Sequence, residues 1–151
     1  MSAPLREQVL AYLAAHNVMT LATTGAEGPW AAAVFYASDG FTLHFLSAPG
    51  SRHGRNIAAH PGVAATIQED DSDWLAIKGI QLEGEAHALE GEPRTKAIAV
   101  YAAKFPLVGP EAPAEIARAL ARVHWYRIVP ARLFFIDNAR GLGHREEVAL
   151  D

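Results

Sequence analysis

The run from Val18 to Ser47 alternates strand-like segments with short turns that contain glycine, in the order VMTLATT, GAEGP, WAAAVFYA, SDG and FTLHFLS. β-Branched and aromatic residues favour strands, and turns this short join strands that run antiparallel. The sequence therefore predicts an antiparallel meander of three strands over this run.

The last two of these strands differ in what they are expected to bury. Side chains alternate between the two faces of a strand, so Phe41, Leu43 and Phe45 share one face, which is expected to meet the core. The strand WAAAVFYA is apolar on both faces, and its three alanines at 31–33 leave room for another sheet or a flat ligand close to the backbone.

The strand-like run from Trp74 to Ala88 changes its apolar phase. The apolar residues Leu75 and Ile77 stand at odd positions, whereas Ile80, Leu82 and later apolar residues stand at even positions, so the two groups would face opposite sides of a regular strand. An extra residue in one strand produces such a change, so we expect a β-bulge at Lys78 and Gly79.

The rest of the chain alternates helical and strand-like segments. Apolar residues at helical spacing predict helices over 5–13, 51–60, 93–104 and 113–123, and strand-like runs follow at 63–69, 124–129 and 132–137 with a turn at Pro130. Residues 1–151 are expected to form one domain. Its expected fold is mainly β, a closed or nearly closed antiparallel barrel of about six strands with peripheral helices.

Composition excludes several classes of site. The 151 residues contain no cysteine and carry a net charge of −4 without a basic run, which disfavours thiolate chemistry and nucleic-acid partners. The seven histidines lack metal-ligand spacing, so no metal site is expected. The first residues lack the apolar centre of a signal peptide, and no run is long enough to span a membrane; a cytoplasmic location is expected.

The segment HFLSAPGSRHGRN is the strongest candidate for a binding site. If Ser51 caps the helix predicted at 51–60, then its hydroxyl, the free N–H groups of the first turn and the Arg52 guanidinium converge on one point. Ser47 and His53 lie nearby in sequence. Such a cluster of donors binds a phosphate or a carboxylate.

These residues, together with DGFTLHFLSAPGSRHGRNIAAHPGVAATI, IQLEGEAHAL and FFIDNARGLGHR, resemble the pyridoxamine 5′-phosphate oxidase-like family of FMN-binding split barrels, and most closely its small YhbP-like branch. The resemblance implies a six-stranded split barrel that dimerises and holds two FMN molecules at the subunit interface. It also implies a flavin-dependent oxidoreductase that acts on a small-molecule substrate or electron donor.

The resemblance assigns roles to individual positions. Residues that match the cofactor-binding positions of the family are Leu46, Ser47, Ser51, Arg52 and His53 around the phosphate; Ala32, Ala33, Val34 and Phe35 along the flavin ring; and Lys78 and Gly79 as a polar contact to it. Asn138, His144 and Arg145 are expected to border the substrate. No residue is assigned a catalytic role.

Three departures from the family pattern bear on function. Basic residues that pyridoxamine phosphate oxidases carry on the flavin strand are replaced by Ala32 and Ala37, and their C-terminal substrate loop is replaced by residues 141–145. His53 stands where a lysine is usual. Pyridoxamine phosphate is therefore disfavoured as a substrate. A non-catalytic flavin or haem carrier, with His53 or His144 as the haem ligand, and an enzyme that uses deazaflavin F420 remain open alternatives.

Overall fold

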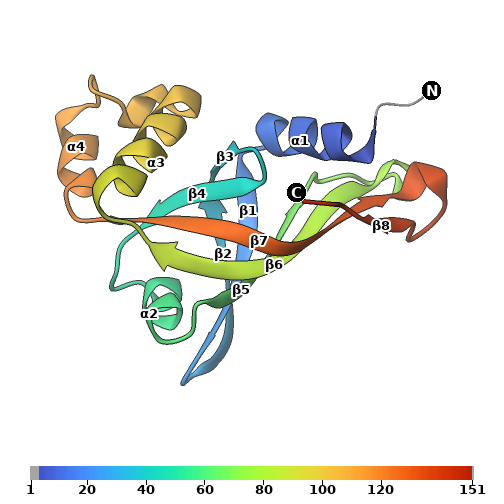
Figure 1. Ribbon diagram of the computed structural model, residues 1–151, viewed down its shortest axis with the longest axis horizontal. Helices are drawn as coiled ribbons and strands as arrows, with labels where there is room; N and C mark the ends of the chain where they lie inside the picture. Colours follow the sequence, from blue (N-terminus) through green and yellow to red (C-terminus); the bar gives the residue numbers. More distant parts are fainter. Residues whose placement is uncertain (1–3, 151) are drawn as a thin grey trace.

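A computed structural model describes residues 4–150 and contains one eight-stranded antiparallel sheet with the order β2-β1-β5-β6-β7-β4-β3, in which β8 also pairs with β7. The sheet curls around a core, and helices lie at its ends (Figure 1). The strands are β1 (Val18–Gly25), β2 (Gly28–Phe35), β3 (Ala37–Asp39), β4 (Thr42–Ser47), β5 (Gly62–Gln68), β6 (Lys78–Ala88), β7 (His124–Asp137) and β8 (Arg145–Glu147). The expected mainly β, antiparallel barrel is confirmed, with the short strands β3 and β8 in addition to the expected six.

The run from Val18 to Ser47 forms two hairpins, and the expected three-stranded meander is wrong. β1 pairs with β2, whereas β4 pairs with β3 and β7. Tyr36 separates β2 from β3 and donates its backbone N–H to the Asn17 carbonyl at 2.9 Å. Gly28 and Gly40 have positive φ angles of 97° and 60°, which glycine adopts without steric cost at the turns of the two hairpins.

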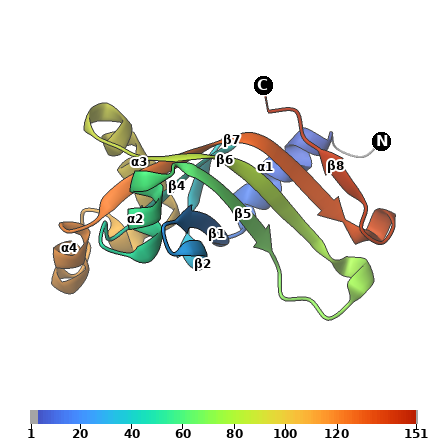
Figure 2. The ribbon, with the colours of Figure 1, turned by 90° about the horizontal axis from the view of Figure 1, so that it is seen from below.

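The long strands β6 and β7 pair along most of their length, and Figure 2 shows them running side by side with β5. Their register shifts between Glu83 and Gly84, opposite Pro130 in the middle of β7. The expected bulge at Lys78 and Gly79 and the expected turn at Pro130 are therefore both wrong. Proline lacks an N–H to donate to a sheet, so it is accommodated at the bulge instead of ending the strand.

The main core fills the inside of the curled sheet. Phe41, Leu43 and Phe45 are buried there, as their alternation predicts. The helix α1 (Leu5–Ala15) closes one end of this core with the fully buried side chains of Val9 and Leu13. Burial of these apolar side chains is the main source of stability for such a fold.

A second, smaller core lies under the helix α3 (Gly91–Lys104), where Ala97 and Tyr101 pack against Trp125 of β7. The helix α4 (Ala114–Leu120) follows, and α2 (Arg52–Ala59) lies on the side of the sheet away from α1 (Figure 1). Short 3₁₀ helices are η1 (Trp74–Ala76), η2 (Pro106–Val108) and η3 (Asn138–Arg140). Among residues 4–150, each helix is too short or too polar to span a membrane.

Candidate functional site

Ser51 caps the helix that follows β4, as the sequence predicts. Its Oγ accepts a hydrogen bond from the Gly54 N–H at 3.1 Å and donates one to the Ala48 carbonyl at 2.8 Å. Gly54 lies so close to the turn that an added Cβ would be 2.8 Å from that same carbonyl oxygen. The turn between β4 and α2 is therefore held tightly against the first turn of the helix.

Ser47 and His53 meet at the same point. Ser47 Oγ lies 2.5 Å from His53 Nε2 and 3.2 Å from Ser51 Oγ. Burial lowers the pKa of His53, so the imidazole is neutral at pH 7. The structure thus brings together three of the side chains predicted to hold a phosphate, next to the positive end of a helix.

Arg52 is directed elsewhere. Its guanidinium carbon lies 4.3 Å from the ring centre of Trp30, and Nη2 donates to the Glu27 carbonyl at 3.2 Å. Its Nε atom is buried and has no hydrogen-bond partner among the residues that the structure describes. The guanidinium is therefore held against the β1–β2 hairpin, although Arg52 directly follows Ser51 in the chain. No local pattern marks Trp30 as a site residue, since only the fold brings its strand beside α2.

The predicted flavin strand, β2, is an edge strand of the sheet and pairs only with β1 along the sheet path. Ala33 and Phe35 are exposed, whereas Ala32 and Val34 are half-buried. An edge strand leaves backbone N–H and C=O groups on its outer side without a sheet partner. These groups suit a planar ligand with hydrogen-bonding edges, or another chain.

Leu46 does not face the turn. Its side chain packs against the small core under α3, opposite Trp125 in the pairing of β4 with β7. A structural role in this core accounts for its apolar character.

A pocket of about 330 Å³ adjoins the turn on the side of β6 and β7. Pro49 and Gly54 line it from the turn and from α2, and His87 and His124 line it from the strands. The rest of its lining is mostly apolar, and no Lys, Arg, Asp or Glu among residues 4–150 lines this pocket.

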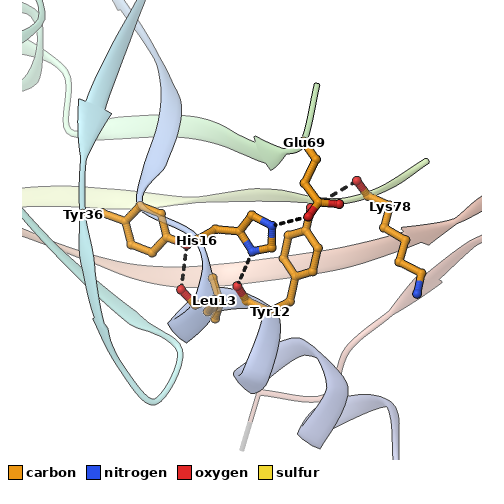
Figure 3. Close-up of polar contacts among 6 residues, drawn as sticks. All are labelled: Tyr12, Leu13, His16, Tyr36, Glu69 and Lys78. Atoms are coloured by element: carbon orange, nitrogen blue, oxygen red, sulfur yellow. Dashed lines mark hydrogen bonds and ion pairs between the residues drawn. The ribbon is translucent and has the colours of Figure 1, made fainter. Parts of the chain in front are cut away.

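Lys78 and Gly79 start β6 in regular register opposite Asp137 and Ile136 of β7. The apolar phase changes here because η1 precedes the strand. An added Cβ at Gly79 would lie 2.9 Å from the carbonyl oxygen of Ile67, so close packing of β5 and β6 accounts for this glycine. The side chain of Lys78 is exposed and points away from its neighbours in Figure 3.

A polar cluster that the sequence analysis did not identify joins α1 to this end of the sheet (Figure 3). Tyr12 donates from its hydroxyl to the Lys78 carbonyl at 3.2 Å. His16 places Nδ1 2.7 Å from the Tyr12 carbonyl and Nε2 3.2 Å from Glu69 Oε1, and its ring stacks on that of Tyr12. Burial raises the pKa of Tyr12 to about 12. The cluster fixes the backbone that carries Lys78.

The predicted substrate-side residues lie at this same end. Asn138 is buried, donates from Nδ2 to the Trp74 carbonyl at 2.8 Å and accepts at Oδ1 from the Gly143 N–H at 3.1 Å. Its amide therefore holds the loops around η1 and η3. His144 Nε2 contacts Glu146 at 2.8 Å, and Arg145 donates to Gln81 at 3.2 Å, so both are engaged by neighbouring strands.

Within one chain the two groups of predicted site residues are far apart. Gly54 and Ile57 of α2 pack near the Ala88 end of β6, whereas Lys78 begins that strand. A strand rises about 3.3 Å per residue, so roughly 30 Å of β6 separates them. Figure 1 shows α2 and β8 on opposite sides of the molecule.

Comparisons with known proteins identify relatives of this chain. Residues 5–137 match the family model described as pyridoxamine 5′-phosphate oxidase. A UPF0306 protein of Enterobacter sp. (strain 638) is 31% identical over 136 residues, which is 89% of either chain. The UPF0306 protein YhbP of Escherichia coli O157:H7 is 29% identical over 136 residues, 89% of this chain and 86% of that protein.

Solved structures share the fold. A heme binding protein from Mycobacterium smegmatis superposes with a TM-score of 0.76 at 26% identity; the match covers 99% of this chain but only 60% of the mycobacterial one. HutZ, a heme storage protein from Vibrio cholerae, superposes with a TM-score of 0.71 at 21% identity over 87% of this chain and 94% of its own. These likenesses and the family match agree with the split barrel seen here, and the chain belongs to the pyridoxamine 5′-phosphate oxidase family.

Proposed function

We propose that this chain binds FMN, with the phosphate at the turn between β4 and α2, and acts in the cytoplasm as a homodimeric flavin-dependent oxidoreductase. The observation that carries the proposal is the meeting of Ser47, Ser51 and His53 at the N-terminus of α2. The Ser47 hydroxyl and the backbone N–H groups at the start of α2 are donors that a phosphate monoester requires, and Ser51 and His53 hold that hydroxyl in place.

Arg52 supports the same ligand. Its Nε is buried without a hydrogen-bond partner among the described residues, and a buried donor of this kind carries an energetic cost until it is paired. Because the guanidinium lies over Trp30, Nε would meet a phosphate beside the turn only after the side chain swings from the hairpin toward Ser51. A charge-assisted hydrogen bond from guanidinium to phosphate is stronger than one between neutral groups.

A second copy of the chain supplies the rest of the proposed site. Lys78 and the tail residues lie about 30 Å along β6 from the phosphate turn, so one chain does not bring them to one ligand. The edge strand β2 and neighbouring β1 expose Val18, Trp30 and Phe35, which are 41%, 42% and 58% exposed. Exposed apolar side chains along an open sheet edge suit association with a second copy. Light scattering of the purified protein tests this, and a monomer at micromolar concentration contradicts it.

The proposed chemistry belongs to the cofactor. When bound, FMN supplies hydride or single-electron transfer, while the protein binds it, orients it and excludes water. In this assignment the backbone of residues 32–35 lies along the flavin ring, and Lys78 of the second copy is the polar contact to it. Asn138 is buried and holds loops, whereas His144 is half-buried and Arg145 is exposed, so these two are better placed to meet a substrate once they release Glu146 and Gln81.

The substrate is proposed to be a small molecule other than pyridoxamine phosphate. Ala32 and Ala37 stand where the enzymes that oxidise pyridoxamine phosphate carry basic residues, and Ala37 is buried under α3. A second phosphate-bearing ligand would therefore lack a counter-charge at these positions.

Titration of the purified protein with FMN tests the proposal. Binding is expected to quench flavin fluorescence and to leave absorption bands near about 370 and 450 nm with the protein after free FMN is removed, and NADH or NADPH is expected to reduce the bound flavin. A protein that takes up no FMN contradicts the proposal. Parallel titration with F420 separates the deazaflavin alternative, because it would bind in place of FMN.

Haem is a second candidate, because the mycobacterial structure of 26% identity is described as a heme binding protein. His53 and His144 are the histidines considered as haem ligands; their Nε2 atoms contact Ser47 and Glu146 respectively, so either contact would have to break. An intense band near about 400 nm on addition of haemin, lost in one of the two histidine-to-alanine variants, favours this candidate.

A further inference from the structure

The contact between Ser47 and His53 bears on how the proposed FMN site recognises its ligand. Nε2 of the ring lies 2.5 Å from Ser47 Oγ, and that hydroxyl lies 3.2 Å from Ser51 Oγ. The Ser51 O–H is donated to the Ala48 carbonyl, so an anion at this turn would accept from Ser47 and would lie one hydroxyl group away from the imidazole.

A phosphate at this point sets the direction of these hydrogen bonds. The dianion has no proton to give, so Ser47 must donate its O–H to a phosphate oxygen and accept at Oγ from an N–H on His53 Nε2. The ring then lies within about 4–6 Å of two negative charges, a separation at which an opposite charge favours the protonated imidazole.

Without a ligand, His53 is neutral. Burial lowers its pKa, and it is the only resolved cause of that shift. On its own helix, Arg55 donates to the Gly50 carbonyl, and Arg52 lies over Trp30 near Glu27 of the β1–β2 hairpin.

The facing strands bring no carboxylate to the ring that would hold a proton there in advance. β1 and β2 contain no titratable residue, His124 of β7 lies opposite Ser47 in the strand register, and Glu85 of β6 contacts His87.

We infer that His53 couples binding of a phosphate dianion to uptake of one proton, so that this site holds phosphomonoesters more tightly as the pH falls. This rests on the proposed function and adds to it the ionic form of the ligand and its regulation by pH. A lysine at this position would keep its charge throughout the neutral range and would take up no proton. The proton comes from solvent and ends on the imidazole ring, and no bond of the ligand is broken.

Calorimetric titration of the wild-type protein with FMN at pH 7.5, in buffers of different ionisation enthalpy, measures the proton uptake directly. We expect about one proton per FMN, and a dissociation constant that rises by up to about tenfold per pH unit between pH 7 and 8.5, where the free phosphate is already a dianion. Riboflavin, which lacks the phosphate, should show neither effect.

Two variants make the test specific. His53→Lys should bind FMN with no proton uptake and with a flat pH profile. His60→Gln, which removes an exposed histidine at the other end of the same helix, should behave as the wild type. FMN binding without proton uptake in the wild type overturns this inference alone and leaves the phosphate site standing. No FMN binding in any variant overturns the proposed function and this inference with it.

Discussion

The guanidinium of Arg52 lies over the ring of Trp30, with its carbon 4.3 Å from the ring centre, and so joins the first turn of α2 to the β1–β2 hairpin. The pair connects the two regions that the family resemblance assigns to one cofactor, the phosphate turn and the strand along the flavin ring. The aromatic face and the hydrogen bond from Nη2 to the Glu27 carbonyl together fix the orientation of the guanidinium.

The stacking of Arg52 on Trp30 is expected to contribute measurably to stability. The Arg52 side chain is only 26% exposed, so we expect a coupling free energy of about 0.5–1 kcal/mol. A double-mutant cycle with Trp30→Ala, Arg52→Ala and the double variant, followed by urea denaturation, measures it. If the change in free energy of unfolding in the double variant equals the sum of the changes in the two single variants, the two side chains do not interact.

Ser51 caps α2 and also belongs to the proposed phosphate site. A charged substitute at this position separates these two roles. Ser51→Ala removes the N-cap and should lower the free energy of unfolding by about 0.5–2 kcal/mol. Ser51→Asp keeps an acceptor for the Gly54 N–H, so stability should stay near that of the wild type, whereas FMN affinity should be lost because a carboxylate repels the phosphate. Retention of FMN by Ser51→Asp would place the phosphate elsewhere.

Replacement by alanine should change the free energy of unfolding differently at two glycines of the same segment. At Gly54 a Cβ would lie 2.8 Å from the Ala48 carbonyl oxygen and 2.9 Å from Ser51 Oγ, whereas at Gly50 it would meet nothing within 4 Å. Despite the better helix propensity of alanine, Gly54→Ala should lower the free energy of unfolding by about 1–2 kcal/mol, because the turn must move. Gly50→Ala is the matched control and should change it by less than about 0.5 kcal/mol. Equal values for the two variants would contradict the tight packing of this turn.

Stability should fall in mild acid because of His44. This residue is 3% exposed, and its Nδ1 has no hydrogen-bond partner in the described part of the chain. Burial lowers its pKa below 6.5; Asp39 offsets part of this shift, and Arg127 and Lys96 add to it. The unfolded chain therefore binds a proton that the folded chain excludes, and stability is lost as the pH falls below about 6.5.

Urea denaturation at pH 7.5 and 5.5 measures this loss. The midpoint should fall on acidification in the wild type, and it should fall less in His44→Leu, which removes the titrating group. His60→Gln, which replaces an exposed histidine, should keep the wild-type dependence. A loss of the same size in His44→Leu would assign the acid sensitivity to other groups, of which the half-buried His53 is the next candidate.

Local patterns predicted the elements that depend on local chemistry. The apolar stripe of α1, the cap at Ser51 and the inward face of Phe41, Leu43 and Phe45 follow from spacing and hydrogen-bonding preference, and the structure contains them. The number and order of the strand-like runs predict an antiparallel barrel, and the family resemblance, confirmed by the match over residues 5–137, implies the same fold.

Features that depend on partners distant in sequence were not predictable in this way. The change from odd to even apolar positions before Ile80 predicts a bulge, but the 3₁₀ turn at Trp74–Ala76 produces the same change. The bulge lies instead where Gly84 faces Pro130. Likewise, no local pattern showed that β4 leaves β2 to pair with β7, or that Trp30 would meet Arg52.

A phosphate anchor at the turn between β4 and α2 is tested by comparing FMN with riboflavin in wild-type protein and in Arg52→Ala. Fluorescence titration should show that the variant loses about 1.5–3 kcal/mol of FMN binding, about 10- to 150-fold in dissociation constant, because a charge-assisted hydrogen bond is lost. Riboflavin affinity should be unchanged by the substitution. Equal losses for the two ligands, or equal affinity of the wild type for both, would contradict a phosphate anchor at this turn.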